Sequence, residues 1–234
     1  MEAATERSGV TAKRQERLLR RADWIEAALA TLIVEGVDSV KVFRLADRLG
    51  VTRGSFYWHF KSREELLATL LETWEAKNTA AILRHACRPH ANLTGAVLDI
   101  FALWVDRALF DPRLDFAIRE WARRSARVHR AVRRADDARV QAIAAIYRKA
   151  GFAREDAFIR ARILYFMQIG YYALDLGEPM AARMRYLRPY LRAFNGEEPD
   201  RALVEAFRRA QHRQPRPARA RRSRAPSGSS RARS

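Results

Sequence analysis

One short segment carries the side chains best suited to chemistry with a polyanion. Its outward-facing members are Tyr57, Trp58 and His59, bracketed by the basic residues Arg53, Lys61 and Arg63. Phe56 and Phe60 lie four residues apart, so they share one face of a helix and are expected to point into the core. That arrangement turns the three side chains between them toward the outer side, where their polar tips can reach phosphate oxygens. The alternative is that these three side chains only cover a helical bundle.

The elements that must position this segment are two short helices joined by a tight turn. Apolar residues at spacings of three, four and seven predict a helix over residues 42–49. Gly50 supplies the backbone freedom that the turn requires, and Ala46 is small enough for a second helix to cross closely. The second helix is expected from Thr52, whose hydroxyl can cap free amides, to about Trp58. Together these features predict a helix-turn-helix.

The segment Arg44-Leu-Ala-Asp-Arg-Leu-Gly-Val-Thr-Arg-Gly-Ser-Phe-Tyr-Trp-His-Phe-Lys-Ser-Arg-Glu-Glu-Leu66 resembles the DNA-binding signature of the tetracycline-repressor (TetR) family almost position for position. The resemblance covers residues 20–75. It implies a homodimer that places each recognition helix in the major groove of a palindromic operator. It also implies repression of a neighbouring gene until a small-molecule effector releases the protein.

Carried onto this sequence, the resemblance assigns two groups of DNA-binding residues. The groove-facing group is Thr52, Arg53, Gly54 and Ser55, and the phosphate-contacting group is Tyr57, Trp58, His59, Lys61 and Arg63. Lys41 is a further predicted DNA-binding residue, although the family pattern does not supply it. Arg53 is the best candidate base reader, because a guanidinium can donate two hydrogen bonds to one guanine edge. Phosphate contacts position a protein without specifying sequence.

Two departures from the family pattern fall at the start of the helix expected over residues 42–49. Lys41 stands where the family often has Thr or Ser, so it can neutralise a phosphate but cannot cap the helix, and Ser39 is expected to take that role. Phe43 stands where a polar residue is frequent. It can pack on the helix expected at residues 21–35 or touch sugar edges, and its role stays open.

The remainder of the chain predicts an all-α protein. Glycine and proline are sparse, apolar residues recur at helical spacing, and no stretch alternates with period two. Breaker residues predict one further helix at 21–35 and another that begins at Ser62 and ends before Pro89. The remaining predicted helices are 94–110, 112–124, 128–150, 155–176, 179–194 and 199–210. The helix at 128–150 has a possible interruption near Asp136. The predicted organisation is a basic disordered arm (1–20), a helix-turn-helix domain (21–68), an effector-binding and dimerisation domain (69–210) and an Arg-rich disordered tail (211–234).

The helix around residues 163–176 is apolar on nearly every face, which predicts cover by a partner subunit. The predicted dimer interface comprises Leu164, Gly170, Tyr171, Met184, Leu187, Leu191 and Phe194. The alternative is a helix central to one large monomer core. Side chains that can line an effector cavity are Phe101, Trp104, Phe116, Trp121, Tyr147, Tyr165, Met167 and Gln168, although aromatic residues at helical spacing are usually core.

Charge supports a polyanionic partner. Lys and Arg total 45 against 27 Asp and Glu, a net charge of +18 that favours double-stranded DNA. A GC-rich coding bias toward Arg is the alternative explanation, and a sequence-independent DNA-coating protein is the alternative function. The arm around Lys13–Arg21 and the tail can add attraction to DNA or act only as solvated ends.

The sequence holds no phosphate-binding glycine loop, nucleophile elbow or metal-ligand spacing, so we expect no enzyme, no cofactor and no metal. The single cysteine, Cys87, cannot form an intramolecular disulfide. No signal peptide or membrane span is expected, so the predicted location is the cytoplasm, with the protein at the nucleoid when operator-bound.

Overall fold

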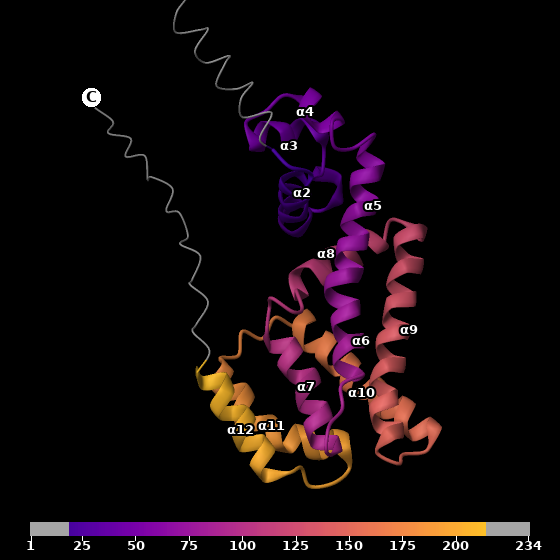
Figure 1. The fold of residues 1–234 in the computed structure, drawn as a ribbon, viewed down its shortest axis with the longest axis vertical. Coiled ribbons are helices and arrows are strands. Elements are labelled where there is room, and N and C mark those ends of the chain that lie inside the picture. The colour runs from indigo at the N-terminus through magenta and orange to yellow at the C-terminus, as the bar shows by residue number, and fades with distance from the viewer. Residues whose placement is uncertain (1–18, 214–234) are drawn as a thin grey trace, which may run out of the picture.

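The computed structural model describes residues 19–213, and the arm and tail predictions for residues 1–18 and 214–234 lie outside this range. Between residues 19 and 213 the backbone forms helices and no strand, which confirms the all-α prediction (Figure 1). The elements are α2 (Arg21–Glu35), η1 (Val37–Ser39), α3 (Val42–Leu49), α4 (Arg53–Tyr57), α5 (Arg63–Trp74), η2 (Glu75–Thr79), α6 (Ala80–Ala86), α7 (Leu93–Val105), α8 (Pro112–Ala122), α9 (Ala126–Lys149), α10 (Arg154–Ala173), α11 (Met180–Asn195) and α12 (Arg201–Arg213). None of these helices is long and apolar enough to cross a bilayer.

Two predictions about where helices stop differ from the structure for local reasons. The helix predicted to reach Phe110 ends at Val105, because Asp106 adopts extended backbone and its Oδ1 accepts a hydrogen bond from the Ala108 amide. That side-chain turn competes with the helix ladder. The interruption predicted near Asp136 is absent, and α9 runs unbroken from Ala126 to Lys149. The Asp136 carboxylate binds the Arg119 guanidinium instead of neighbouring backbone amides.

The helix predicted from Ser62 contains a wide turn. Its ordinary α-helical parts, α5 and α6, are joined by η2, a five-residue π-helical segment. A π turn changes the register between the two parts and turns different side chains inward. Asn78 and Thr79, at the end of η2, are buried as a result.

Buried side chains form two apolar cores. The first core contains residues of α2 to α5 together with α8 and the first half of α9, which ends at Ala135. The second contains residues of α6 and α7, the second half of α9, and α10 to α12. The long helix α9 therefore passes from one core to the other, as Figure 1 shows beside α5 and α6.

A buried ion network lies where the two cores meet. Asp115 is only 1% exposed. One carboxylate oxygen accepts hydrogen bonds from Trp74 Nε1 (2.7 Å), Arg139 (3.1 Å) and Asn78 Nδ2 (3.3 Å). The other oxygen accepts a hydrogen bond from Arg119 Nε (2.9 Å). Burial alone raises the pKa of a carboxyl, but the Arg139 and Arg119 charges and the Trp74 hydrogen bond outweigh it. The pKa of Asp115 therefore lies below its usual value.

Arg139 extends this network across the molecule. Its fully buried guanidinium donates to Thr79 Oγ1 (2.9 and 3.1 Å) and to Tyr165 Oη (2.9 Å) as well as to Asp115. Tyr165 in turn donates to Asp136 Oδ1 (2.7 Å). One connected set of hydrogen bonds thus joins η2, α8, α9 and α10.

Candidate nucleic-acid interface

The turn between α3 and α4 has the geometry of a helix-turn-helix. Gly50 adopts the left-handed conformation (φ 68°, ψ 33°), and the Val51 amide donates to the Ala46 carbonyl at 3.0 Å. A side chain at residue 50 would meet nothing within 4 Å, so the backbone conformation, rather than space, requires glycine. Ala46 is buried where the helices cross.

An aromatic cluster fixes α4 on this frame. Phe56 and Phe60 stack with ring centroids 5.3 Å apart, and Trp24 of α2 meets Phe56 edge-on at the same distance. All three rings are fully or almost fully buried, as predicted for the two phenylalanines. Tyr57 and Trp58 point outward with exposed fractions of 61% and 88%.

The N-terminal end of α4 presents the predicted base-reading residues, with one exception. Thr52, Arg53 and Gly54 are exposed, and among the described residues Arg53 has no carboxylate partner. Its guanidinium carbon lies 6.0 Å from the Phe43 ring centroid. Ser55, in contrast, is buried, so it does not face outward as predicted. It precedes Phe56 on the short helix and shares its inward side.

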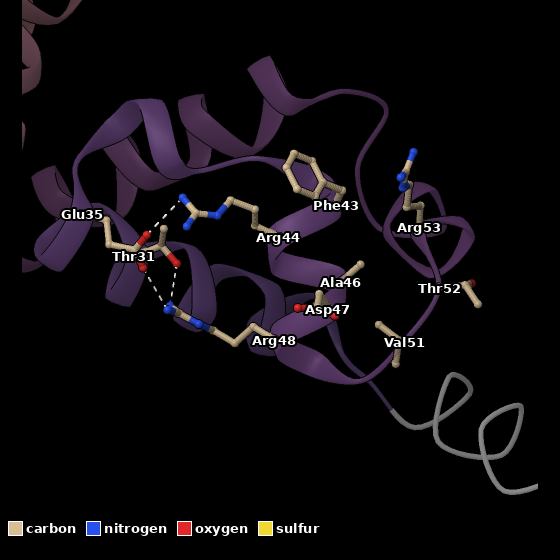
Figure 2. Close-up of a pocket in the computed structure, with 10 residues that line it drawn as sticks. All are labelled: Thr31, Glu35, Phe43, Arg44, Ala46, Asp47, Arg48, Val51, Thr52 and Arg53. Carbon is tan, nitrogen blue, oxygen red and sulfur yellow. Dashed lines mark hydrogen bonds and ion pairs between the residues drawn. The ribbon is translucent and has the colours of Figure 1, made fainter. Parts of the chain in front are cut away.

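Phe43, whose role the sequence left open, is half-exposed in a groove beside Arg53 (Figure 2). The groove has a volume of about 760 Å³ and lies between α2, α3 and the start of α4. On its opposite side Glu35 binds Arg44 (3.2 Å) and Arg48 (3.0 Å). Of the three arginines that line the groove, Arg44 and Arg48 are therefore paired with a carboxylate, while Arg53 is not.

The predicted phosphate contacts divide into available and engaged groups. Lys41 and Lys61 are exposed, and His59 is half-buried. The Arg63 guanidinium donates to the carbonyls of Val40 and, at 2.9 Å, Val37, so it ties α5 to the segment before α3. This intramolecular engagement argues against the predicted phosphate contact.

Helix capping near the interface also differs in detail from prediction. Lys41, not Ser39, is the N-cap of α3, and no side chain caps that end. At α5, Ser62 Oγ accepts from the Glu65 amide (3.2 Å) as a capping box predicts, but Glu65 returns its bond to the Lys61 amide (2.7 Å) rather than to Ser62.

The residues predicted to line an effector cavity are not brought into one cavity. Trp104 and Phe116 line a cleft of about 450 Å³ with Tyr171 and Tyr172. Phe101 and Tyr147 are buried in the second core, and Trp121 packs against the first. The physical reason is helical periodicity, because these aromatic residues face different sides of helices that contribute to both cores.

The three predicted effector residues of α10 have separate surroundings. Tyr165 is buried in the ion network, and Met167 packs on the second core. Gln168 is buried, and its Nε2 has no hydrogen-bond partner among the described residues.

The predicted dimer-interface residues largely face the protein's own core. Those buried are Leu164, Met184, Leu187, Leu191 and Phe194, and only Gly170 and Tyr171 are half-buried. The apolar side chains exposed on α10 and α11 are instead Ile159, Ile163, Phe166, Tyr186 and Tyr190. Helix α10 is apolar on two faces, and the prediction chose the inner one.

The geometry defines a helix-turn-helix module with an exposed arginine at the start of its second helix and exposed aromatic residues at its end. Residues 25–70 match the model of bacterial regulatory proteins of the tetR family. This segment of the chain is therefore similar to the corresponding region of tetR-family regulatory proteins.

Two bacterial regulators are similar to this chain over segments of comparable length. The class A tetracycline repressor protein from transposon 1721 of Escherichia coli is 44% identical over 54 residues, 23% of this chain and 25% of the repressor. The regulator TtgR of Pseudomonas putida is 38% identical over 60 residues, 26% of this chain and 29% of TtgR. The similarity thus spans about a quarter of the length of each relative.

Solved structures extend the likeness to the whole fold. GusR of Salmonella enterica has a TM-score of 0.54 with 18% identity, covering 81% of this chain and 92% of GusR. A putative transcriptional regulator from Pseudomonas aeruginosa PAO1 has a TM-score of 0.55 with 16% identity, covering 86% of this chain and 98% of its own. At these identities the likeness concerns the arrangement of helices.

Proposed function

We propose that this protein is a sequence-specific DNA-binding transcriptional regulator, a repressor that binds a palindromic operator as a homodimer and is released by a small-molecule effector. The observation that carries the proposal is Arg53. Its guanidinium is exposed, has no carboxylate partner among the described residues, and sits at the first position of a rigidly held α4. In the major groove such a group can donate two hydrogen bonds to one guanine.

The other exposed groups of the module position the protein on the duplex. Tyr57, Trp58, Lys41 and Lys61 surround the ends of α3 and α4 and contact phosphates and sugars. Phe43 lies beside Arg53 and offers an apolar surface to a thymine methyl group or a deoxyribose. In this proposal residues 21–68 bind DNA, and residues 69–210 bind the effector and the second subunit.

The Arg53→Ala variant tests sequence-specific binding. Affinity for the preferred duplex should fall by about 1–3 kcal/mol, with discrimination lost at one position of each half-site, because the base contact is removed. The matched control is Arg84→Ala, which removes the same charge from an exposed position on α6. A uniform weakening on preferred and scrambled duplexes alike would instead support the sequence-independent DNA-coating function.

The exposed apolar face of α10 and α11 supports the homodimer. Ile163 and Phe166 are each about half exposed on α10, and Tyr186 and Tyr190 on α11. Exposed apolar side chains of this size are unfavourable in water, and they are removed from it when an identical face packs against them. Two helices from each subunit then form a four-helix interface.

The effector is proposed to bind the cleft around Trp104, Phe116 and Tyr172. Tyr172 Oη donates to the Trp104 carbonyl (2.7 Å), which fixes one wall. The aromatic lining suits a planar molecule.

Release requires the effector to favour one of two states. The helix that runs through α5, η2 and α6 connects the DNA-binding module to the helices around the cleft. A shift of this helix changes the spacing between the two α4 helices of a dimer. Only a ligand with different affinities for the two states can drive that shift.

A further inference from the structure

Three arginines line the cleft proposed for the effector, and none of them has an acidic partner. Arg107 lies in the turn after α7, Arg113 near the start of α8 and Arg183 near the start of α11. Among residues 19–213 none of the three guanidinium groups forms an ion pair. Like charges around one cleft repel one another, and an anion placed among them offsets that repulsion.

Arg183 is the most firmly held of the three. It is half-buried, whereas Arg107 and Arg113 are exposed. Its guanidinium carbon lies 4.7 Å from the centroid of the Tyr171 ring, another residue that lines the cleft. A contact of this kind restricts a long side chain before any ligand arrives, so less conformational entropy is lost on binding. The guanidinium is therefore positioned in advance for a ligand group.

The positive charges converge on one wall of the cleft. Burial raises the pKa of the Tyr172 hydroxyl, while the nearby charges of Arg183 and Arg107 act in the opposite direction. The same hydroxyl is fixed to the Trp104 carbonyl at 2.7 Å. Two guanidinium groups from different elements therefore lie near one point of the aromatic wall.

Two acidic residues also line the cleft, but at its outer turn. Asp175 and Glu178 lie between α10 and α11, and both are exposed. Water and salt screen exposed charges, so these carboxylates repel an anion in the cleft less than the half-buried Arg183 attracts it. The charge at the aromatic wall therefore favours an anion over a cation.

The aromatic walls indicate the uncharged part of the ligand. Trp104 is buried and Phe116 is half-buried in the lining of the cleft. Tyr172 stacks on the buried Phe110 with ring centroids 5.9 Å apart and planes 11° apart, so the wall is supported from behind. The volume of about 450 Å³ lies in the range of small-molecule sites. A flat apolar ring system suits these walls.

We propose that the cleft binds a planar aromatic carboxylate, with Arg183 holding the acid group. Arg107 and Arg113 add positive charge around it, and the ring system lies against Trp104 and Phe116. A guanidinium suits a carboxylate because its planar fork donates two parallel hydrogen bonds. The inference rests on the proposed function, because it assigns a chemical class to the effector of the same cleft.

Calorimetric titration of the full chain without DNA tests the proposal with two probes of the same shape. The probe 2-naphthoate carries an acid group on a flat ring system, and 2-naphthamide replaces that group with an uncharged amide. The acid should bind at least about tenfold more tightly, because one charge-assisted hydrogen bond contributes that factor or more. Arg183→Gln should remove most of this advantage and leave binding of the amide unchanged.

Two further variants control for position and for charge. Arg185→Gln removes an arginine of the same helix that also lies over an aromatic ring, 5.6 Å from the Tyr186 centroid, but does not line the cleft. Both probes should bind this variant as they bind the unchanged protein. Glu178→Gln removes a carboxylate from the cleft, so naphthoate should bind more tightly. Structural damage in a variant would instead weaken both probes alike, and circular dichroism melting checks each fold.

The outcomes separate this inference from the proposed function. Equal binding of the two probes, an undiminished preference for the acid in Arg183→Gln, or no binding of naphthoate at about 1 mM would overturn the aromatic-acid site. The proposed function still stands in that case if the unchanged protein selects one duplex sequence. If naphthoate binds as expected and no duplex sequence is selected, the aromatic-acid site stands and the proposed function fails.

Discussion

Replacing Arg139 with methionine removes the most deeply buried charge of the ion network and leaves its partner in place. The substitution keeps an unbranched stem of similar length but deletes hydrogen bonds to Asp115, Thr79 and Tyr165. Asp115 is 1% exposed, so water does not replace the lost guanidinium. Breaking a buried ion pair by removing one partner costs about 3–5 kcal/mol.

The structure places this variant at the lower end of that range. Asp115 keeps Arg119 Nε at 2.9 Å and Trp74 Nε1 at 2.7 Å, so its charge remains partly compensated. We therefore expect Arg139→Met to lower the free energy of unfolding by about 3 kcal/mol. Urea titration followed by circular dichroism measures this loss from the midpoint and slope.

A neighbouring arginine supplies the control for this prediction. Arg133→Met changes the same residue type on the same helix at an exposed position, and its cost should stay within about 0.5 kcal/mol. A loss below 1 kcal/mol for Arg139→Met would refute the view that the buried network holds the two cores together.

Three further predictions address other parts of the structure. The lowered pKa of Asp115 means that its contribution to stability is fully present above its unfolded-state pKa of about 3.9 and is lost as pH falls through the still lower folded-state value. Urea titrations from pH 7 to pH 3 should show the onset of this loss in the unchanged protein and no such loss in Asp115→Asn. Gly50→Ala should destabilise by about 1–2 kcal/mol, because φ is 68°, and an unchanged melting temperature would contradict the left-handed turn. Phe166→Asp should convert a dimer to monomers in sedimentation equilibrium, while Val34→Asp, at a more exposed position on α2, should not; a dimer that persists would place the interface elsewhere.

The sequence predicted those elements in which several local signals agree. For α2 and α3, apolar periodicity and a following glycine all indicate the same bounds, and the structure has helices at Arg21–Glu35 and Val42–Leu49. The inward positions of Phe56 and Phe60 follow from their spacing alone. Local chemistry therefore suffices where a helix has one apolar face and clear ends.

Features that depend on tertiary contacts were not predictable in this way. Arg63 lies next to the aromatic segment in sequence, but its guanidinium is used by the Val37 and Val40 carbonyls, which only the fold brings near. Helix α10 is apolar around most of its circumference, so periodicity cannot tell the inner face from the outer one. Five of the seven residues predicted at a dimer interface lie in the protein's own core for that reason.

The buried network did leave one signal in the sequence. Arg139 continues the apolar stripe Val128, Val132, Ala135 and Ile143 at helical spacing, so a charged residue occupies a core position. A buried arginine requires a buried carboxylate, and Asp115 and Arg119 stand four residues apart on the preceding helix. Their pairing across two helices still required the structure.

Selection of bound fragments from a random duplex library at about 150 mM salt tests the central claim most directly. At this ionic strength sequence preference can be distinguished from the general electrostatic attraction between DNA and a protein with a net charge of +18. We predict a palindromic consensus with a guanine in each half-site whose selection depends on Arg53. Fragments without any consensus, together with binding that collapses as the salt concentration rises, would contradict a sequence-specific regulator.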